Sequence, residues 1–181
     1  MSKSKRIVLG VTGSIAAYKA GDLIRRLKDR QFAVSVIMTR EAGKFITPLT
    51  LAGLSGEKVY QEMFEVTDDT WAQSHIGLAR DAAVFLIAPA TANVIAKLAH
   101  GLADDLLTCT ALATRAPIIV APAMNDAMFT NKIVQENCAK LKKAGFHFVE
   151  PTKGNLACGV FGDGHLADVD DIVKSVVRLA K

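Results

Sequence analysis

The 181-residue sequence has few aromatic residues and no long hydrophobic run. Because aromatic residues make up only 6% of the chain, we do not expect a mixed basic and aromatic surface for nucleic acid. The net charge of +4 suits a phosphorylated small molecule better. No apolar stretch approaches the roughly 20 residues that cross a bilayer, and the first apolar run is too short for a signal peptide. These absences predict a cytoplasmic protein with neither a nucleic-acid nor a membrane partner.

Cysteine is also scarce, since only Cys109, Cys138 and Cys158 are present. They have neither the even number of a disulfide framework nor the paired spacing of a zinc site, so we expect reduced thiols and no metal. Cys109 lies in an apolar helical pattern and is expected in the core. Cys158 lies in a glycine-rich segment, where a chemical role and a structural role are equally open.

The chain does contain short apolar runs rich in β-branched residues, at residues 6–11, 33–38, 83–88 and 117–121. They are continuous rather than alternating, which predicts strands that are covered on both faces. Helical patterns separate them, at residues 16–29, 92–98, 105–113 and 131–144. This alternation predicts a parallel sheet in one Rossmann-like (flavodoxin-like) three-layer α/β domain over residues 1–181.

The carboxyl-terminal part is less regular. Residues 146–149 form a plausible fifth strand, and Asp168 is a suitable cap for a final helix that ends near Leu179. Residues 152–167 contain four glycines and no sustained period, which predicts a mobile loop. We call these residues the substrate flap.

Ligands of open parallel sheets bind beyond the carboxyl ends of the strands, and the first two such segments are rich in small or polar residues. Gly13, Ser14 and Ile15 form a turn that opens a helix, where free N–H groups and the helix dipole favour a phosphate. The glycines match neither the dinucleotide fingerprint nor a P-loop, and a tight turn without ligand explains them equally well. After the second strand, Thr39 offers a hydroxyl for a phosphate, and Phe45 either stacks on a ring system or packs in the core.

The third and fourth strands end in further candidates. A helix that carries His75 leads into the third strand, whose small and polar end is Pro89, Ala90, Thr91, Ala92 and Asn93. From these residues alone, a lone His such as His75 is more often a surface or satisfied helix residue, and Asn93 similarly is read as a helix cap. After the fourth strand, Asn125 either donates an amide hydrogen bond to a carboxylate or forms an Asx-turn before the next helix.

Taken together, these segments resemble the homo-oligomeric flavin-containing cysteine decarboxylase family over about residues 6–167. The motifs at residues 13–16, 75, 89–93 and 122–128 occur in the order that this family has. The resemblance implies FMN as cofactor and a trimer-based assembly, a homotrimer or homododecamer, with the flavin at a subunit interface. This sequence departs from the family pattern at Phe129, where Trp is more frequent, and at His165, where Arg is more frequent.

The resemblance also implies roles for the candidate residues. His75 is expected to act as acid and base, and Cys158 to donate a proton. The expected substrate contacts come from Ala123, Met124, Asn125 and His165. The expected cofactor contacts come from Gly13, Ser14, Ile15, Thr39, Phe45, Pro89, Ala90, Thr91, Ala92 and Asn93.

Within the family, the segment around Cys158 is similar to that of members that decarboxylate 4'-phosphopantothenoylcysteine on the way to coenzyme A. The alternatives are a peptidyl-cysteine decarboxylase and a non-catalytic flavin-binding regulatory protein. A nicotinamide-dependent Rossmann enzyme rests on the fold alone. No synthetase domain follows in the sequence, so we expect a stand-alone enzyme.

Overall fold

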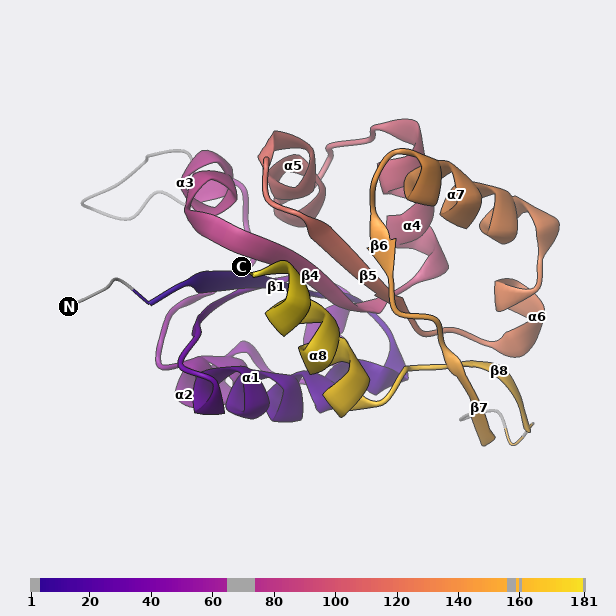
Figure 1. Ribbon diagram of the computed structural model, residues 1–181, viewed down its shortest axis with the longest axis horizontal. Coiled ribbons are helices and arrows are strands. Elements are labelled where there is room, and N and C mark those ends of the chain that lie inside the picture. Colours follow the sequence, from indigo (N-terminus) through magenta and orange to yellow (C-terminus); the bar gives the residue numbers. More distant parts are fainter. Residues whose placement is uncertain (1–3, 65–73, 156–158, 160, 181) are drawn as a thin grey trace.

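The computed structural model describes residues 4–64, 74–155, 159 and 161–180. Its centre is a six-stranded parallel sheet with the order β3-β2-β1-β4-β5-β6 (Figure 1). The strands are β1 (Arg6–Val11), β2 (Ala33–Met38), β3 (Val59–Tyr60), β4 (Ala82–Ala90), β5 (Ile118–Pro122) and β6 (His147–Phe148). This confirms the predicted parallel α/β fold.

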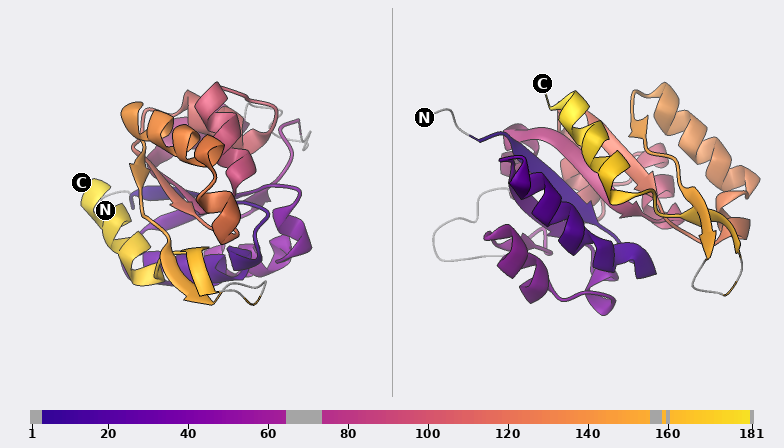
Figure 2. Two further views of the ribbon diagram at one scale, coloured as in Figure 1. Left: turned by 90° about the vertical axis from the view of Figure 1, so that its right-hand side faces the viewer. Right: turned by 60° about the horizontal axis from the view of Figure 1, so that its bottom comes forward.

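Helices cover both faces of the sheet. The helical elements are η1 (Ile15–Lys19), α1 (Ala20–Asp29), η2 (Ala42–Lys44), α2 (Pro48–Ser55), α3 (Ser74–Asp81), α4 (Ala92–His100), α5 (Leu106–Ala113), α6 (Asp126–Phe129), α7 (Lys132–Lys143) and α8 (Val169–Leu179). One core packs α1, α2 and α8 on one face, and a second core packs α3, α4, α5 and α7 on the other. Figure 2 shows α1 and α8 side by side across the first face.

The buried strands explain this three-layer arrangement. Along β1, Ile7 and Leu9 join the first core, whereas Val8 points into the second. Because both faces of the strand are covered, the sequence is apolar at every position rather than at alternate ones. The same physical cause made these strands predictable from the sequence, and β1 and β2 have the predicted bounds.

Several short elements of the fold were not predicted. The edge strand β3 has only two residues, and the short helices α2 and α6 were not expected. The predicted helix at residues 16–29 begins instead as the 3-10 helix η1 and continues as α1. Among the described residues, no helix is long and apolar enough to cross a membrane.

The predicted mobile loop at residues 152–167 was wrong for the part that the structure describes. There, β7 (Thr152–Asn155) pairs in antiparallel fashion with β8 (Phe161–His165). The glycines of β8 allow the backbone to approach its neighbours: a Cβ on Gly164 would lie 2.3 Å from the carbonyl oxygen of Met124. Strands held by backbone pairing and close approach leave no pattern of alternating side chains, so the sequence could not reveal them.

The strand order places a crevice at the carboxyl ends of the strands. From β1 the chain adds β2 and β3 on one side of β1, and it then adds β4, β5 and β6 on the other side. The direction of strand addition therefore reverses between β1 and β4. In open α/β sheets, ligands bind at such a switch point, beyond the carboxyl ends of the strands. The loops after β1, β2, β4 and β5 all lie at these ends.

Near the amino ends of the strands, a half-buried polar cluster is formed by Arg6, Ser35 and Glu57. Arg6 donates hydrogen bonds to Ser35 and to the Glu57 carboxylate, which also accepts a hydrogen bond of 2.7 Å from the Ser35 hydroxyl. Burial alone would raise the pKa of Glu57, but the hydrogen bonds from Arg6 and Ser35 outweigh it and lower the pKa below its ordinary value. The cluster therefore stabilises the fold more when Glu57 is ionised than when it is protonated.

We predict that Glu57→Gln lowers the free energy of unfolding by about 1 kcal/mol at neutral pH. Because the folded-state pKa lies below the unfolded one, this contribution is present above the unfolded pKa and is lost as the pH falls through the folded pKa. Urea denaturation at pH 7 and near pH 3 measures the difference in the free energy of unfolding between the wild type and Glu57→Gln at high and at low pH. The control is Glu150→Gln, which removes an exposed ion pair with Lys142 and should change little. An equal gap at both pH values would contradict this account.

Candidate active site

A cavity of about 640 Å³ lies at the switch point of the sheet, within the range of about 300–1,000 Å³ that ligand pockets have. It is lined by the segments that follow β1, β2, β4 and β5 and by the end of β8. The predicted site residues that line it are Gly13, Ser14, Ile15, Thr39, Thr91, Ala92, Asn93, Ala123, Met124, Asn125 and His165. Folding thus brings together most residues that the sequence singled out.

Two helix starts meet at this cavity. Ser14 caps η1, which runs directly into α1, by accepting a hydrogen bond from the Ala16 N–H at 3.4 Å. Thr91 caps α4 by accepting one from the Val94 N–H at 3.4 Å. Both starts present backbone N–H groups and the positive end of a helix dipole to the same space, which favours an anionic group.

The buried hydroxyl of Thr12 fixes the spacing between these two helix starts. It donates a hydrogen bond of 2.7 Å to the carbonyl of Pro89 and accepts one of 3.1 Å from the Thr91 N–H. Pro89 and Ala90 form the end of β4 and do not appear among the lining residues. The backbone of Ala90 instead accepts a hydrogen bond of 3.0 Å from the Ala123 N–H, which ties β4 to the loop after β5.

Asn125 occupies the start of the short helix α6. Its Oδ1 atom accepts hydrogen bonds from the N–H groups of Ala127 at 3.0 Å and Met128 at 3.4 Å. The capping alternative is therefore confirmed, and the same side chain also lines the cavity. Next to it, the Met124 N–H donates to the carbonyl of Gly164 at 3.0 Å, so that β8 and the Asn125 loop form one joined wall.

Other candidates lie elsewhere. Phe45 ends η2, is 46% exposed and does not line the cavity. His75 lies in the first turn of α3, which packs on α5, and it too is not a lining residue. Its Nδ1 atom is buried and has no hydrogen-bond partner among the described residues. Cys158 lies outside the described residues. The roles of these three residues stay predictions.

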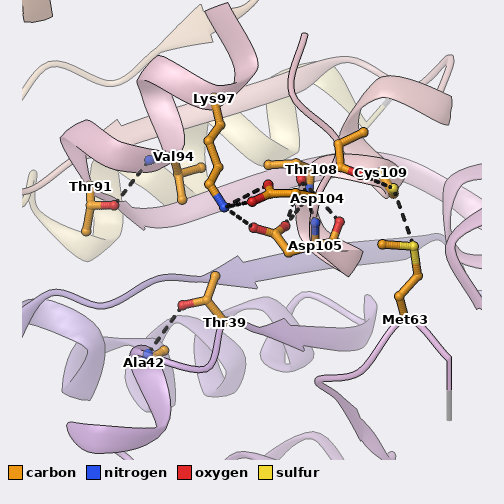
Figure 3. A network of polar contacts seen from close by, with 11 residues as sticks. Thr39, Ala42, Met63, Thr91, Val94, Lys97, Asp104, Asp105, Thr108 and Cys109 are labelled. Carbon is orange, nitrogen blue, oxygen red and sulfur yellow. Dashed lines mark hydrogen bonds and ion pairs between the residues drawn. The ribbon is translucent and has the colours of Figure 1, made fainter. Parts of the chain in front are cut away.

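A charged cluster that was not predicted from the sequence consists of Lys97, Asp104 and Asp105, of which Lys97 and Asp105 line the cavity (Figure 3). The Lys97 ammonium lies 2.8 Å from Asp104 and 2.9 Å from Asp105. Asp105 was predicted only as the first residue of a helix. A lysine eight residues before a helix-capping Asp gives no recognisable motif, because its contact depends on the turn between α4 and α5.

The strand order and the cavity at its switch point define an open, doubly wound α/β protein with a ligand-binding cavity. A protein-family model described as Flavoprotein matches residues 1–181. The chain belongs to the Flavoprotein family.

Relatives with similar sequences support this assignment. The chain is 47% identical over 175 residues to a protein of Streptococcus mutans serotype c named "Probable phosphopantothenoylcysteine decarboxylase", with 96% of this chain and 97% of that one covered. It is 44% identical to the "Coenzyme A biosynthesis bifunctional protein CoaBC" of Bacillus subtilis. That match covers 96% of this chain but only 43% of the longer bifunctional relative.

A solved structure has the same fold over nearly the whole chain. It is a mutant of PPC decarboxylase complexed with pantothenoylaminoethenethiol, and it has a TM-score of 0.84 and 32% identity, covering 98% of each chain. Another solved relative, with 31% identity and a TM-score of 0.85, is the FMN-dependent cysteine decarboxylase SpaF.

We predict that Gly13→Ala destabilises the protein and weakens its binding of flavin. A Cβ at residue 13 would lie 2.5 Å from the Cβ of Glu41, so the turn after β1 or the turn after β2 must move. Such overpacking costs about 1–3 kcal/mol. The measurements are the melting temperature and the flavin titration of the purified variant. The control is Gly53→Ala, whose added Cβ would meet nothing within 4 Å. Unchanged values for Gly13→Ala would contradict the close packing described here.

Proposed function

We propose that this chain catalyses the FMN-dependent decarboxylation of 4'-phosphopantothenoylcysteine to 4'-phosphopantetheine, a step in coenzyme A biosynthesis. The observation that carries the proposal is the full-length similarity to a relative named for this activity, together with the cavity at the switch point. The solved PPC decarboxylase mutant supports it, since its ligand is an enethiol, the kind of compound that oxidative decarboxylation of a cysteine gives. Coenzyme A synthesis implies a cytoplasmic enzyme.

The residues at the cavity fit FMN. One end joins two helix starts, at Ser14 and Thr91, which suits the phosphate of a mononucleotide. Gly13 lies so close to Glu41 that a side chain at residue 13 would displace the turn after β1 or the turn after β2, which both line the cavity. Thr39 adds a hydroxyl, and Ala123 and Met124 form a wall without charge where a ring can lie. The whole cavity is large enough for a ligand of this size.

The chemistry explains the need for a redox cofactor. Loss of CO2 from a cysteine carboxylate leaves an electron pair on a carbon with no neighbouring acceptor. When bound, FMN supplies a hydride acceptor for an oxidation before this loss and a hydride donor afterwards, so that the overall reaction has no net redox change. The oxidised substrate carries a C=S bond, which accepts the electron pair and becomes an enethiol.

We assign the remaining steps to three side chains. Asn125, held by its cap on α6, orients the substrate carboxylate beside the cofactor. His75 accepts the thiol proton as the substrate is oxidised. Cys158, on the substrate flap, donates the proton that accompanies reduction of the enethiol. Residues 1–181 act in this proposal as one catalytic domain.

His75 does not line the cavity of its own chain, so we place it at the cavity of a neighbouring chain. Two separate surfaces expose large apolar side chains: Ile76 and Leu112 lie on α3 and α5, and Ile15 and Tyr18 lie on η1 at the cavity. Two different surfaces that pair between copies make a head-to-tail interface, which forms a ring when the rotation between copies closes. This supports a homotrimer, or a homododecamer built from trimers, with the cofactor at each interface.

The substrate is tested by offering the enzyme 4'-phosphopantothenoylcysteine and a cysteine-terminated peptide side by side. We expect the first compound alone to lose one CO2 with no other change in mass, as followed by mass spectrometry. Efficient turnover of the peptide and none of the phosphorylated compound would contradict the proposal. In the Cys158→Ser variant, we expect a product that has lost CO2 and two further hydrogens. Normal 4'-phosphopantetheine from that variant would remove Cys158 from the mechanism.

The shared site is tested by mixing two inactive variants, His75→Asn and Asn125→Asp. Aspartate caps a helix as well as asparagine does, but its charge repels the substrate carboxylate. Each variant should keep its flavin spectrum and lose decarboxylation. Coexpressed in equal amounts, the two should recover about a quarter of the wild-type activity, because one site in four then takes both intact residues from neighbouring chains.

Mixed assemblies in which chains of both variants bind FMN, yet no activity is recovered, would place each site within a single chain. The control is coexpression of two differently tagged His75→Asn chains, which should assemble and remain inactive.

A further inference from the structure

The Lys97–Asp104–Asp105 cluster and the helix starts that suit a phosphate lie at different parts of the cavity. Thr91, at the start of α4, and Lys97 both line the cavity. They are six residues apart on one helix, which is a rise of about 9 Å. In Figure 3 the Lys97 side chain lies apart from Thr91, and its ammonium is turned toward the two carboxylates. The cavity therefore has an anion-binding part and, further along α4, a charged pair.

The two oxygens of Asp105 have separate partners. Oδ1 accepts hydrogen bonds of 2.8 Å from both the N–H and the hydroxyl of Thr108, which close the capping box of α5. Oδ2 lies 2.9 Å from the Lys97 ammonium. Thr108 is fully buried, so the carboxylate is fixed by the helix to which it belongs.

Both groups are held in their charged forms. Burial alone would lower the pKa of Lys97, but the hydrogen bonds and charges of Asp104 and Asp105 raise it above its ordinary value. Burial alone would raise the pKa of Asp105, but the hydrogen bonds from Thr108 and the Lys97 ammonium lower it. At neutral pH the cavity wall therefore presents a fixed ammonium beside a fixed carboxylate.

The charge of the cluster limits what can bind there. One ammonium and two carboxylates leave a net charge of −1, which repels a phosphate. An uncharged ring edge with an N–H beside a carbonyl matches the pair, because a carboxylate oxygen has a further lone pair and an ammonium has three N–H donors. The flavin ring system has one such edge, at N3–H and the carbonyls on either side of it.

We propose that Asp105 and Lys97 recognise the pyrimidine edge of the flavin ring, with the Asp105 carboxylate accepting from N3–H and the Lys97 ammonium donating to an adjacent carbonyl. The inference rests on the proposed function, because it takes FMN as the ligand of this cavity. It also sets the orientation of the cofactor, with the phosphate at the helix starts and the ring extending along α4. The two residues are specificity determinants for the cofactor and take no part in moving protons.

The direct test compares FMN with N3-methyl-FMN, in which a methyl group replaces the N3 hydrogen. Both are titrated into the wild-type apoprotein, and binding is followed by quenching of flavin fluorescence. We expect N3-methyl-FMN to bind at least about tenfold more weakly, since the methyl group removes the N3–H donor and its bulk pushes the ring edge away from the Asp105 carboxylate. This readout needs neither substrate nor turnover.

Asp105→Asn tests the acceptor without removing the helix cap. Asparagine caps as well as aspartate, so Oδ1 can keep its bonds to Thr108 while Nδ2 replaces the oxygen near Lys97. A donor then faces the N3–H donor, so we expect FMN affinity to fall at least about tenfold and the preference over N3-methyl-FMN to shrink to about twofold. Lys97→Met removes the other partner while keeping the apolar stem, and it should weaken both flavins and keep the preference.

The matched control is Asp104→Asn. Asp104 pairs with Lys97 but is largely exposed and does not line the cavity, so the preference should stay within about twofold of wild type. Circular dichroism and melting temperature confirm that each variant is folded. Equal binding of the two flavins by wild-type protein, or an unchanged preference in folded Asp105→Asn, would overturn the inference and leave the proposed function standing. Failure of the wild type to bind FMN would overturn both.

Discussion

The hydrogen bonds of one buried hydroxyl join the two central strands of the sheet where both enter the ligand cavity. Strand order reverses between β1 and β4, so the chain leaves these two adjacent strands toward opposite faces of the sheet. Thr12 follows β1 and bonds through its side chain to the backbone on both sides of the end of β4, at Pro89 and Thr91. It thereby sets the gap between the helix starts at Ser14 and Thr91. The width of the cavity, and the place for an anionic group within it, depend on that gap.

The other walls are arranged around this fixed point. The loop after β5 is tied to β4 by the backbone of Ala123 and to β8 by the backbone of Met124, so Asn125 is held from two sides. Lys97 on α4 and Asp105 at the start of α5 form a charged part of the cavity wall. The cavity therefore has three chemically different parts. The helix starts at Ser14 and Thr91 form the first, the uncharged wall of Ala123 and Met124 forms the second, and the ion pair of Lys97 with Asp105 forms the third. A cofactor with a phosphate, an apolar ring face and a polar ring edge is complementary to this arrangement.

How much the sequence revealed depended on whether a residue's role is local. Buried strands such as β1 and the start of α8 at Asp168 follow from short-range patterns, whereas the cap of α4 is Thr91 and not the suggested Asn93. The order of the post-strand segments predicted that residues 13–15, 91–93 and 123–125 would meet. The β7–β8 hairpin was missed because its glycines serve close approach, of Gly164 to Met124 and of Gly162 to Asp126, which no periodicity in the sequence indicates. The partnership of Lys97 with Asp105 was missed for a similar reason, since it depends on the turn that brings α5 back beside α4. Phe45 and His75 show the reverse case: both are recognisable in sequence, yet neither reaches the cavity of its own chain.

The central claim is that one cavity at the switch point holds FMN, with its phosphate at the helix starts of Ser14 and Thr91. A crystal structure of the protein grown with FMN tests it most directly. The account expects flavin density within this cavity, with the phosphate contacting the backbone near Gly13 to Ile15 or at Thr91 to Asn93. Density with the phosphate against Lys97 and Asp105, or flavin bound outside the cavity, would contradict it.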